Sequence, residues 1–256
     1  MAKSDTTSIS LTTSPAFDGA KARKLLIAAS LIAALLPAIP YAHFVLYPIR
    51  LFVTFVHEAG HAIAALISGG SVVSLHVHPD ASGVTPIQVT NLTAWFSLSS
   101  GYVGAALFGA LLIQVGRIKK AQNAGKAILG LCALSLLLIT VIWGWHDPFT
   151  LVSGLGLTTV LGVAARFLRP VQATFCSLFL AVQCCLNAIS DFRTLLVVNV
   201  NPSLQAENDA LFMQQQYLIP SAVWAVLWAA IGITMTFLSL RSYWRATAKT
   251  TADGTV

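Results

Sequence analysis

Residues 51–68, LFVTFVHEAGHAIAALIS, decide the fold of this chain. The stretch is apolar or small except around His57, Glu58 and His61. Its length is close to the ~20 residues with which a helix crosses the hydrocarbon core of a bilayer. Backbone polar groups in lipid must find their hydrogen bonds within the segment, so we expect a membrane helix. Ionisable side chains in such a helix are energetically expensive and by default indicate a functional site.

Similar apolar runs lie on both sides of this helix. They cover about 25–46, 94–115, 127–146, 149–168, 171–190 and 217–240. Only 9% of the residues carry a charge, whereas soluble domains have about 25%. This deficit excludes a water-facing surface over most of the chain. We therefore expect a single all-α membrane domain, a polytopic helical bundle of about six or seven transmembrane helices.

The positive charges fall at the ends of these runs. The formal net charge is +6, and its clusters lie at 21–24, 117–126, 166–169 and 241–249. Clusters of Lys and Arg beside membrane segments are typical of the cytoplasmic side. If all the clusters share one side, the chain makes an even number of crossings, so we expect one early segment not to cross fully. The clusters form no continuous basic face, which argues against a nucleic-acid partner.

Three segments depart from the apolar helical pattern. Residues 1–24 are rich in Ser and Thr and are expected to form a disordered N-terminal tail, and 245–256 a short C-terminal tail. Residues 71–89, SVVSLHVHPDASGVTPIQV, alternate β-branched residues around a Pro-Asp-Ala-Ser-Gly turn, which predicts a β-hairpin. The membrane domain between the two tails covers 25–244, and the hairpin follows its most polar helix.

His57, Glu58 and His61 match the pattern H-E-x-x-H. Positions i and i+4 of a helix lie on one face, so both imidazoles can reach one ion. Zinc accepts neutral imidazole nitrogen in a tetrahedral site and lowers the pKa of bound water toward about 7. Glu58 follows the first histidine directly and can take a proton from that water. We predict one Zn²⁺ per chain, with Glu58 as the general base; the alternative is that these side chains only bond neighbouring helices.

A catalytic zinc site usually has three protein ligands and one water, so a third ligand must come from elsewhere. Asp209 is the preferred candidate, because it begins a run that can enter the membrane with the last helix. Asp191 is the alternative, although it ends an apolar run near Arg193 and also fits an ion pair or a helix cap. Asp80 and Asp147 fit a turn and a helix cap instead.

With these residues in view, the chain resembles the site-2-protease family of intramembrane zinc metallopeptidases, and most closely its small compact branch. The resemblance covers about 50–240. It is carried by His57-Glu58-x-x-His61, Gly69-Gly70 at the end of that helix, Gly83-Val84-Thr85 in the hairpin, Gly101 and Gly104 in the next helix, and Asn208-Asp209-Ala210 before the last helix. The chain departs from the family around Asp209, where Ala210 replaces the glycine of many members.

This resemblance implies an intramembrane zinc metalloprotease that hydrolyses peptide bonds of transmembrane or membrane-associated protein substrates. It implies His57, His61 and Asp209 as zinc ligands, Glu58 as the general base, and 25–244 as the metallopeptidase domain. The hairpin is then expected to hold the unwound substrate as an added strand. The protein is expected to be an integral multi-pass protein of the cell membrane, in contact with the lipid bilayer and with a membrane-protein substrate.

Two other functions fit the same residues. A catalytically inactive homologue would keep the metal site as a membrane scaffold, and a zinc-dependent cleavage assay separates it from a protease. An ion- or proton-coupled transporter would bind its ion through the intramembrane His and Glu side chains. Transporters of that kind carry inverted repeats or paired broken helices, and neither pattern is evident in this sequence.

Overall fold

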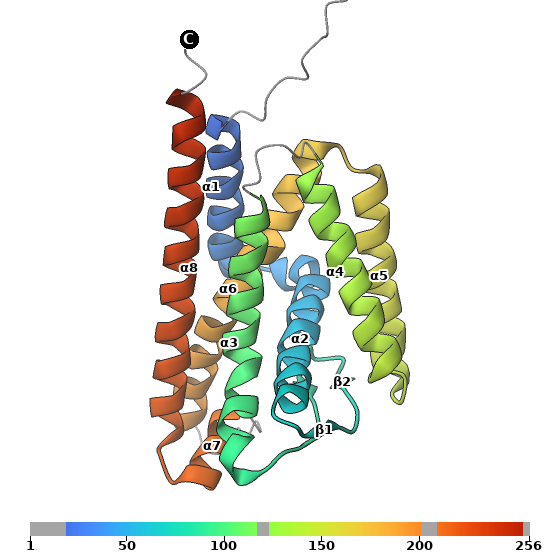
Figure 1. Ribbon diagram of the computed structural model, residues 1–256, viewed down its shortest axis with the longest axis vertical. Coiled ribbons are helices and arrows are strands. Elements are labelled where there is room, and N and C mark those ends of the chain that lie inside the picture. Colours follow the sequence, from blue (N-terminus) through green and yellow to red (C-terminus); the bar gives the residue numbers. More distant parts are fainter. Residues whose placement is uncertain (1–18, 117–122, 201–208, 253–256) are drawn as a thin grey trace, which may run out of the picture.

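The computed structural model of the chain is a bundle of long helices with a small β-hairpin at one end (Figure 1). It describes residues 19–116, 123–200 and 209–252, with side chains described outside 187–200 and 249–252. Its helices are α1 (Gly19–Leu35), α2 (Ala42–Ile67), α3 (Asn91–Gly116), α4 (Ala124–Ile142), α5 (Pro148–Phe167), α6 (Pro170–Val200), α7 (Asp209–Tyr217) and α8 (Ser221–Ala252). A short 3₁₀ helix, η1 (Leu36–Ala38), connects α1 to α2.

Five of the described helices are long and apolar enough to cross a membrane, namely α2, α3, α4, α5 and α8 as far as Ala248. α6 contributes a shorter apolar segment, Pro170–Leu186. Large apolar side chains on these helices face outward, for example Val152, Val160 and Phe167 of α5. Outward apolar side chains are suited to lipid, so the all-α membrane class is confirmed and the protein is an integral membrane protein.

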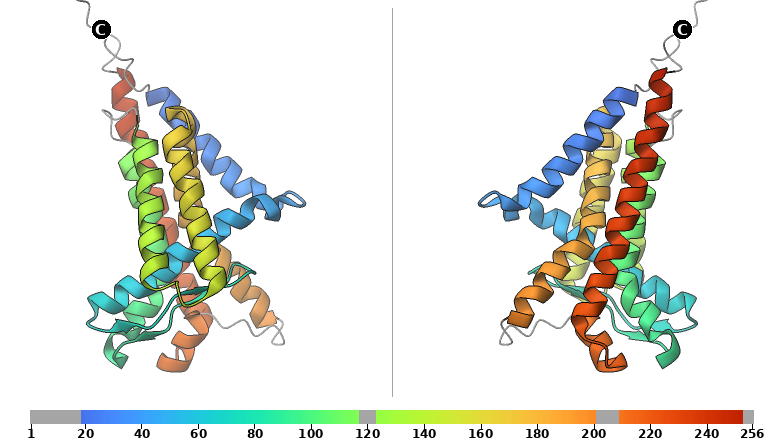
Figure 2. Two further views of the ribbon diagram at one scale, coloured as in Figure 1. Left: turned by 90° about the vertical axis from the view of Figure 1, so that its right-hand side faces the viewer. Right: turned by 90° about the vertical axis from the view of Figure 1, so that its left-hand side faces the viewer.

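α1 and α2 together make one crossing of the bundle. The apolar run expected over 25–46 is interrupted by η1, which contains Pro37 and is followed by Pro40, because proline lacks the N–H that a continuing helix needs. α1 starts at the end of the bundle where α8 finishes. α2 continues from the middle of the bundle toward the hairpin (Figures 1 and 2). Of these two helices, only α2 is long and apolar enough to cross a membrane, so α1 is the candidate for the early segment expected not to cross fully. The two ends of the described chain lie at the same end of the bundle (Figure 1).

Both predicted tails are partly helical. Residues 19–24, expected as part of a disordered tail, form the start of α1, because Ala22 is fully buried and α1 packs against α6 and α8. Likewise α8 continues through 245–252, where Thr247 is buried. α1 thus begins before the boundary expected at 24, and α8 ends after the one expected at 244. Residues 1–18 and 253–256 lie outside the described part of the chain.

The described parts of the basic clusters lie on elements that meet at one end of the bundle, the upper end in Figure 1. The start of α1, the end of α8, the start of α4 and the α5–α6 junction all lie there. Arg23 of α1 lies over the ring of Trp244 of α8, with 5.2 Å between the guanidinium carbon and the ring centroid. The Lys126 ammonium of α4 donates to the Arg166 carbonyl at 3.3 Å. We call this the basic end, and the opposite end, with the hairpin and α7, the hairpin end.

α3 is the central helix and packs against α2, α6 and α8. Its crossing with α2 is close because glycines lie at the contact. A Cβ on Gly60 would overlap the Ser100 carbonyl, and a Cβ on Gly104 would lie 3.5 Å from the Gly60 Cα. Small residues allow such close approach of helices in membranes. The crossing brings the middle of α3 against the part of α2 that carries His57 and His61.

The hairpin expected over 71–89 is present as two short antiparallel strand pairs. β1 (Ser71–Val72) pairs with β4 (Ile87–Gln88), and β2 (His76–Val77) pairs with β3 (Gly83–Val84). At the turn, the Asp80 carboxylate accepts hydrogen bonds from the Ser82 backbone N–H at 2.9 Å and from its hydroxyl at 2.7 Å. These bonds confirm the turn role predicted for Asp80.

The turn of the hairpin is held against α2 by two hydroxyl groups. The Tyr47 hydroxyl donates to the Pro79 carbonyl at 2.7 Å, and the Thr54 hydroxyl donates to the Ala81 carbonyl at 2.8 Å. The hairpin turn therefore lies along the half of α2 that precedes His57.

The outer edge of β2 is held by the connection between α4 and α5. The Val77 N–H donates to the Thr150 hydroxyl oxygen at 2.8 Å, and the Leu75 N–H donates to the Trp143 carbonyl at 3.0 Å. The Asp147 carboxylate in turn accepts bonds from the Thr150 N–H and hydroxyl, both at 2.7 Å. These bonds confirm Asp147 as the N-cap of α5 and lower the pKa of its carboxyl below the ordinary value.

Candidate metal centre

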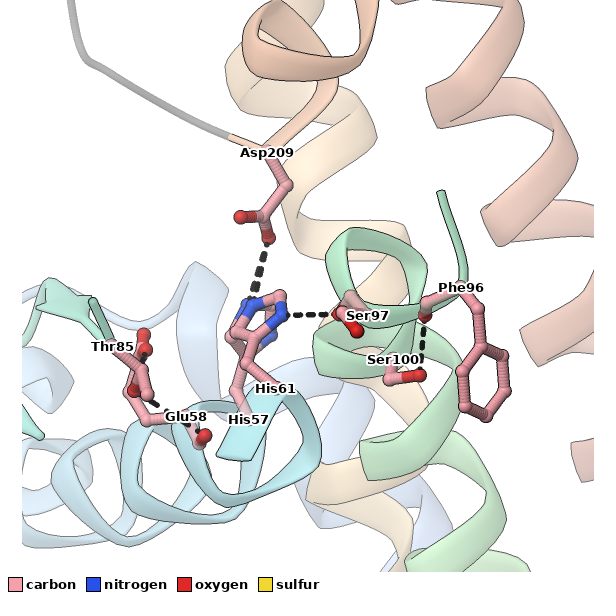
Figure 3. Close-up of polar contacts among 8 residues, drawn as sticks. All are labelled: His57, Glu58, His61, Thr85, Phe96, Ser97, Ser100 and Asp209. Atoms are coloured by element: carbon pink, nitrogen blue, oxygen red, sulfur yellow. Dashed lines mark hydrogen bonds and ion pairs between the residues drawn. The ribbon is translucent and has the colours of Figure 1, made fainter. Parts of the chain in front are cut away.

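Three side chains from distant parts of the chain meet at the hairpin end. His57 and His61 project from one face of α2, and Asp209 is the first residue of α7. The His57 Nε2 lies 3.1 Å from the Asp209 Oδ2, the His61 Nε2 lies 3.2 Å from the same oxygen, and the two Nε2 atoms are 3.1 Å apart (Figure 3). Within the described ranges, no other group of three potential metal ligands comes together in this way.

A hydrogen bond directs the His61 ring toward the other two groups. The His61 Nδ1 lies 2.8 Å from the Ser97 carbonyl of α3. A carbonyl only accepts, so Nδ1 must carry the hydrogen, and Nε2 is then the ring atom that could offer a lone pair to a metal. Histidines that bind metals are usually oriented by a bond of this kind.

Aromatic packing fixes the His57 ring. The Tyr102 ring of α3 packs against it in a T-shaped pair, with ring centroids 4.4 Å apart and an interplanar angle of 79°. Tyr102 itself stacks on Trp228 of α8 at 4.9 Å. The packing of α3 against α8 therefore places an aromatic ring beside His57.

The position of Asp209 depends on the attachment of α7 to the start of α3. The Tyr217 hydroxyl donates to the Asn91 carbonyl at 2.8 Å and accepts from the Trp95 N–H at 2.9 Å. Met213, in the middle of α7, is fully buried. α7 is thus held at its last residue and along its middle, and its first residue is carried to the two histidines.

The Asp209 carboxyl is held in its charged form. Its burial alone would raise its pKa, but the neighbouring His61 and His57 imidazoles lower the pKa below the ordinary value. The alternative third ligand, Asp191, and its neighbour Arg193 lie in the part of α6 whose side chains are outside the described set.

The three ligand atoms have the spacing of a tetrahedral metal site. Two ligands at about 2.0–2.1 Å from a tetrahedral ion lie about 3.3 Å apart, and the separations here are 3.1–3.2 Å. Gly101 of α3 faces the same space, because a Cβ on it would overlap the Nε2 atoms of both His57 and His61. Two imidazoles and one carboxylate are a donor set used by catalytic zinc. The residues present therefore fit a zinc ion.

Glu58 lies beside this group and is held from the hairpin side (Figure 3). Its side chain is buried, and its Oε2 accepts a hydrogen bond of 2.7 Å from the Thr85 hydroxyl. Gly83 also lies against it, since a Cβ there would be 2.6 Å from the Glu58 Oε1. The Glu58 carboxylate therefore lies next to the three candidate ligands but is not one of them. A general base for an attacking water is needed in this position.

The sequence identifies the four polar side chains that converge here, but not the residues that orient them. The roles of the Ser97 carbonyl, Gly101 and Tyr102 emerge only from the packing of α3 on α2. One signal was available, because Ser97 and Gly101 are a helical turn apart and so share a face of an otherwise apolar helix. The stacking of Tyr102 on Trp228 has no such signal.

The comparisons with known proteins concern the whole membrane domain. A family model described as Peptidase M50B-like matches residues 26–239. The matched region includes the H-E-x-x-H helix, the hairpin and the start of α7. No curated protein and no solved structure matches the chain.

Proposed function

This chain belongs to the Peptidase M50B-like family, and from that premise we propose that it is a zinc-dependent endopeptidase acting within the membrane. One observation carries the proposal: the His57 Nε2, His61 Nε2 and Asp209 Oδ2 atoms lie within 3.2 Å of one another beside the Glu58 carboxylate. Ionisable groups buried in a membrane protein are expensive. A bound cation would compensate for gathering them in one place.

We assign His57, His61 and Asp209 as the ligands of one zinc ion. When bound, zinc would act as a Lewis acid that lowers the pKa of a bound water and polarises a peptide carbonyl. The bond from the His61 Nδ1 to the Ser97 carbonyl supports this assignment, because it leaves the Nε2 atom to offer a lone pair to a cation.

We assign Glu58 as the general base. Its carboxylate takes a proton from the attacking water and later delivers that proton to the leaving amine. Its burial and its bond to Thr85 support this role, because a carboxylate with a fixed position can accept the proton in one defined direction.

An open strand edge supports the hairpin as the site that holds the substrate. Val77 lies opposite Gly83 in the strand register. The Val77 N–H points away from Gly83 and donates to Thr150, so the two residues form a non-hydrogen-bonded pair. In such a pair the N–H and carbonyl groups of Gly83 also point away from the partner strand, toward the opposite edge of the hairpin. No hydrogen bond from the backbone of Gly83 or Thr85 to another described element takes up this edge. An extended peptide can pair there by strand addition.

The proposed substrate is a transmembrane or membrane-associated protein of the same bilayer, which we take to be the cell membrane. The carbonyls of a substrate helix are bonded within the helix, so the segment must unwind before a carbonyl can be attacked. Pairing with the free edge of β3 compensates for the helical hydrogen bonds lost in unwinding.

Cleavage of a transmembrane substrate in liposomes by wild-type protein and by Glu58→Gln tests this function. We expect Glu58→Gln to lose about 10²–10⁴-fold in rate and to keep its zinc, because the substitution leaves the three ligands in place. Cleavage by Glu58→Gln at the normal rate would remove the assigned base. A wild-type protein that binds zinc but cleaves no membrane substrate would instead be the inactive scaffold.

A further inference from the structure

We propose that Thr85 is a positioning residue for Glu58, and that it acts from the same strand edge that receives the substrate. The inference rests on the proposed function and adds a residue to it. In this arrangement, the backbone of Thr85 pairs with the substrate strand. The side chain of the same residue orients the base.

The first support is the geometry around the carboxylate. The Thr85 hydroxyl donates to the Glu58 Oε2 at 2.7 Å and also lies 3.3 Å from the Glu58 carbonyl oxygen. On the other side, Gly83 leaves room for the Oε1, because a Cβ would come within 2.6 Å of it. A glutamate side chain has several rotamers of similar energy. The hydrogen bond and the close strand together select one of them.

The second support is the alternation of the strand. Gly83 and Thr85 both face α2, whereas Val84 between them faces away and is 43% exposed. Residues two apart in a strand also send their backbone groups to the same edge. The open edge next to Gly83 therefore continues at Thr85. A substrate strand added there would bond directly to the residue whose hydroxyl holds Glu58.

The third support is that the hairpin is already attached to the helices without this bond. Tyr47 and Thr54 of α2 hold its turn, and Thr150 of α5 holds β2. The Thr85 hydroxyl is therefore not required to keep the hairpin in place. Its distinct contact is with the Glu58 side chain, which points to a role in catalysis.

The test compares Thr85→Val, Thr85→Ser and Thr54→Val in the purified full-length protein. Valine keeps the shape of threonine and removes the hydroxyl, whereas serine keeps the hydroxyl. Thr54→Val is the matched control, because it removes a bond between α2 and the same hairpin that does not involve the Glu58 carboxylate. Zinc content, kcat and KM for a transmembrane substrate in liposomes are measured for each variant.

We expect Thr85→Val to keep its zinc and to lose about 10- to 100-fold in kcat, with KM within about twofold of wild type. Thr85→Ser should recover most of the loss, and Thr54→Val should lower kcat less than Thr85→Val does. The inference is overturned if Thr85→Val keeps a normal kcat, loses its zinc or changes only KM. It is also overturned if Thr85→Ser or Thr54→Val loses as much kcat as Thr85→Val does. Those results leave the proposed function intact, whereas absence of cleavage by the wild type removes both.

Discussion

The two ends of the bundle carry charge in opposite ways. At the basic end, the Arg23 guanidinium lies over an aromatic ring and the Lys126 ammonium donates to a carbonyl. At the hairpin end, His57, His61 and Asp209 are buried or partly buried and contact one another. Charges of the first kind suit water and lipid headgroups. Buried ionisable groups such as those at the hairpin end need a partner of opposite charge inside the protein. The basic end is therefore suited to orienting the protein in the membrane, and the hairpin end to chemistry.

The largest expected effect concerns orientation. If the basic end is cytoplasmic, the hairpin end faces the other side of the membrane. A cysteine at the exposed hairpin position, Ser82→Cys, should react with a membrane-impermeant maleimide added to intact cells. A cysteine at the start of α4, Asn123→Cys, should react only after lysis. The native cysteines give a low background, because each is buried or half-buried. The reverse labelling pattern would show that charge does not orient this protein.

The next effect tests whether the hairpin end holds an ion. Gly101→Ala should lower zinc affinity by about 10- to 100-fold or more, because its Cβ would overlap the Nε2 atoms of both histidines. Gly104→Ala is the matched control on the same helix, since its Cβ would meet only an ordinary contact at 3.5 Å. Metal titration of both variants measures the difference. Equal affinities would mean that the ion does not occupy the space beside Gly101.

A glycine near the basic end should behave differently. A Cβ on Gly125 of α4 would overlap the backbone of Thr174 of α6. Gly125→Ala should therefore destabilise the fold by about 1–3 kcal/mol through overpacking, and the zinc bound per folded chain should not change. Thermal unfolding and metal analysis of the same sample measure both quantities. Loss of zinc from the folded variant would mean that the two ends are coupled.

The smallest effect concerns the N-cap of α5, which supports the hairpin. Asp147→Ala should cost about 1 kcal/mol of stability, and Asp147→Asn less, because asparagine also caps helices. The bonds from Thr150 lower the pKa of the folded-state carboxyl. Its contribution is therefore present above about pH 4, the ordinary pKa, and is lost as the pH falls through the lowered value. Unfolding measured against pH should show this loss in wild type and not in Asp147→Ala.

Local sequence patterns were sufficient to predict the helices and to select the first two candidate ligands. Apolar runs determine membrane helices because lipid leaves the backbone no other partner. The spacing of His57 and His61 determines that they share a face. Asp209 was preferred over Asp191 on weaker grounds, because no local pattern fixes which distant acid reaches the histidines.

Long-range packing determines what the sequence did not reveal. The prolines after α1 predict a break, but the direction in which α2 continues is set by its crossing with α3. The contacts of Thr85 with Glu58 and of Gly101 with the histidines join residues far apart in the chain. Such pairs have no periodic signal, so they can be found only once the helices and the hairpin are placed.

The central claim is that His57, His61 and Asp209 hold one zinc ion, and metal analysis of purified protein tests it most directly. Wild type should contain about one zinc per chain, Asp209→Asn should contain much less, and Asp191→Asn should resemble wild type. Wild-type protein without zinc, or equal zinc in the two aspartate variants, would contradict the claim.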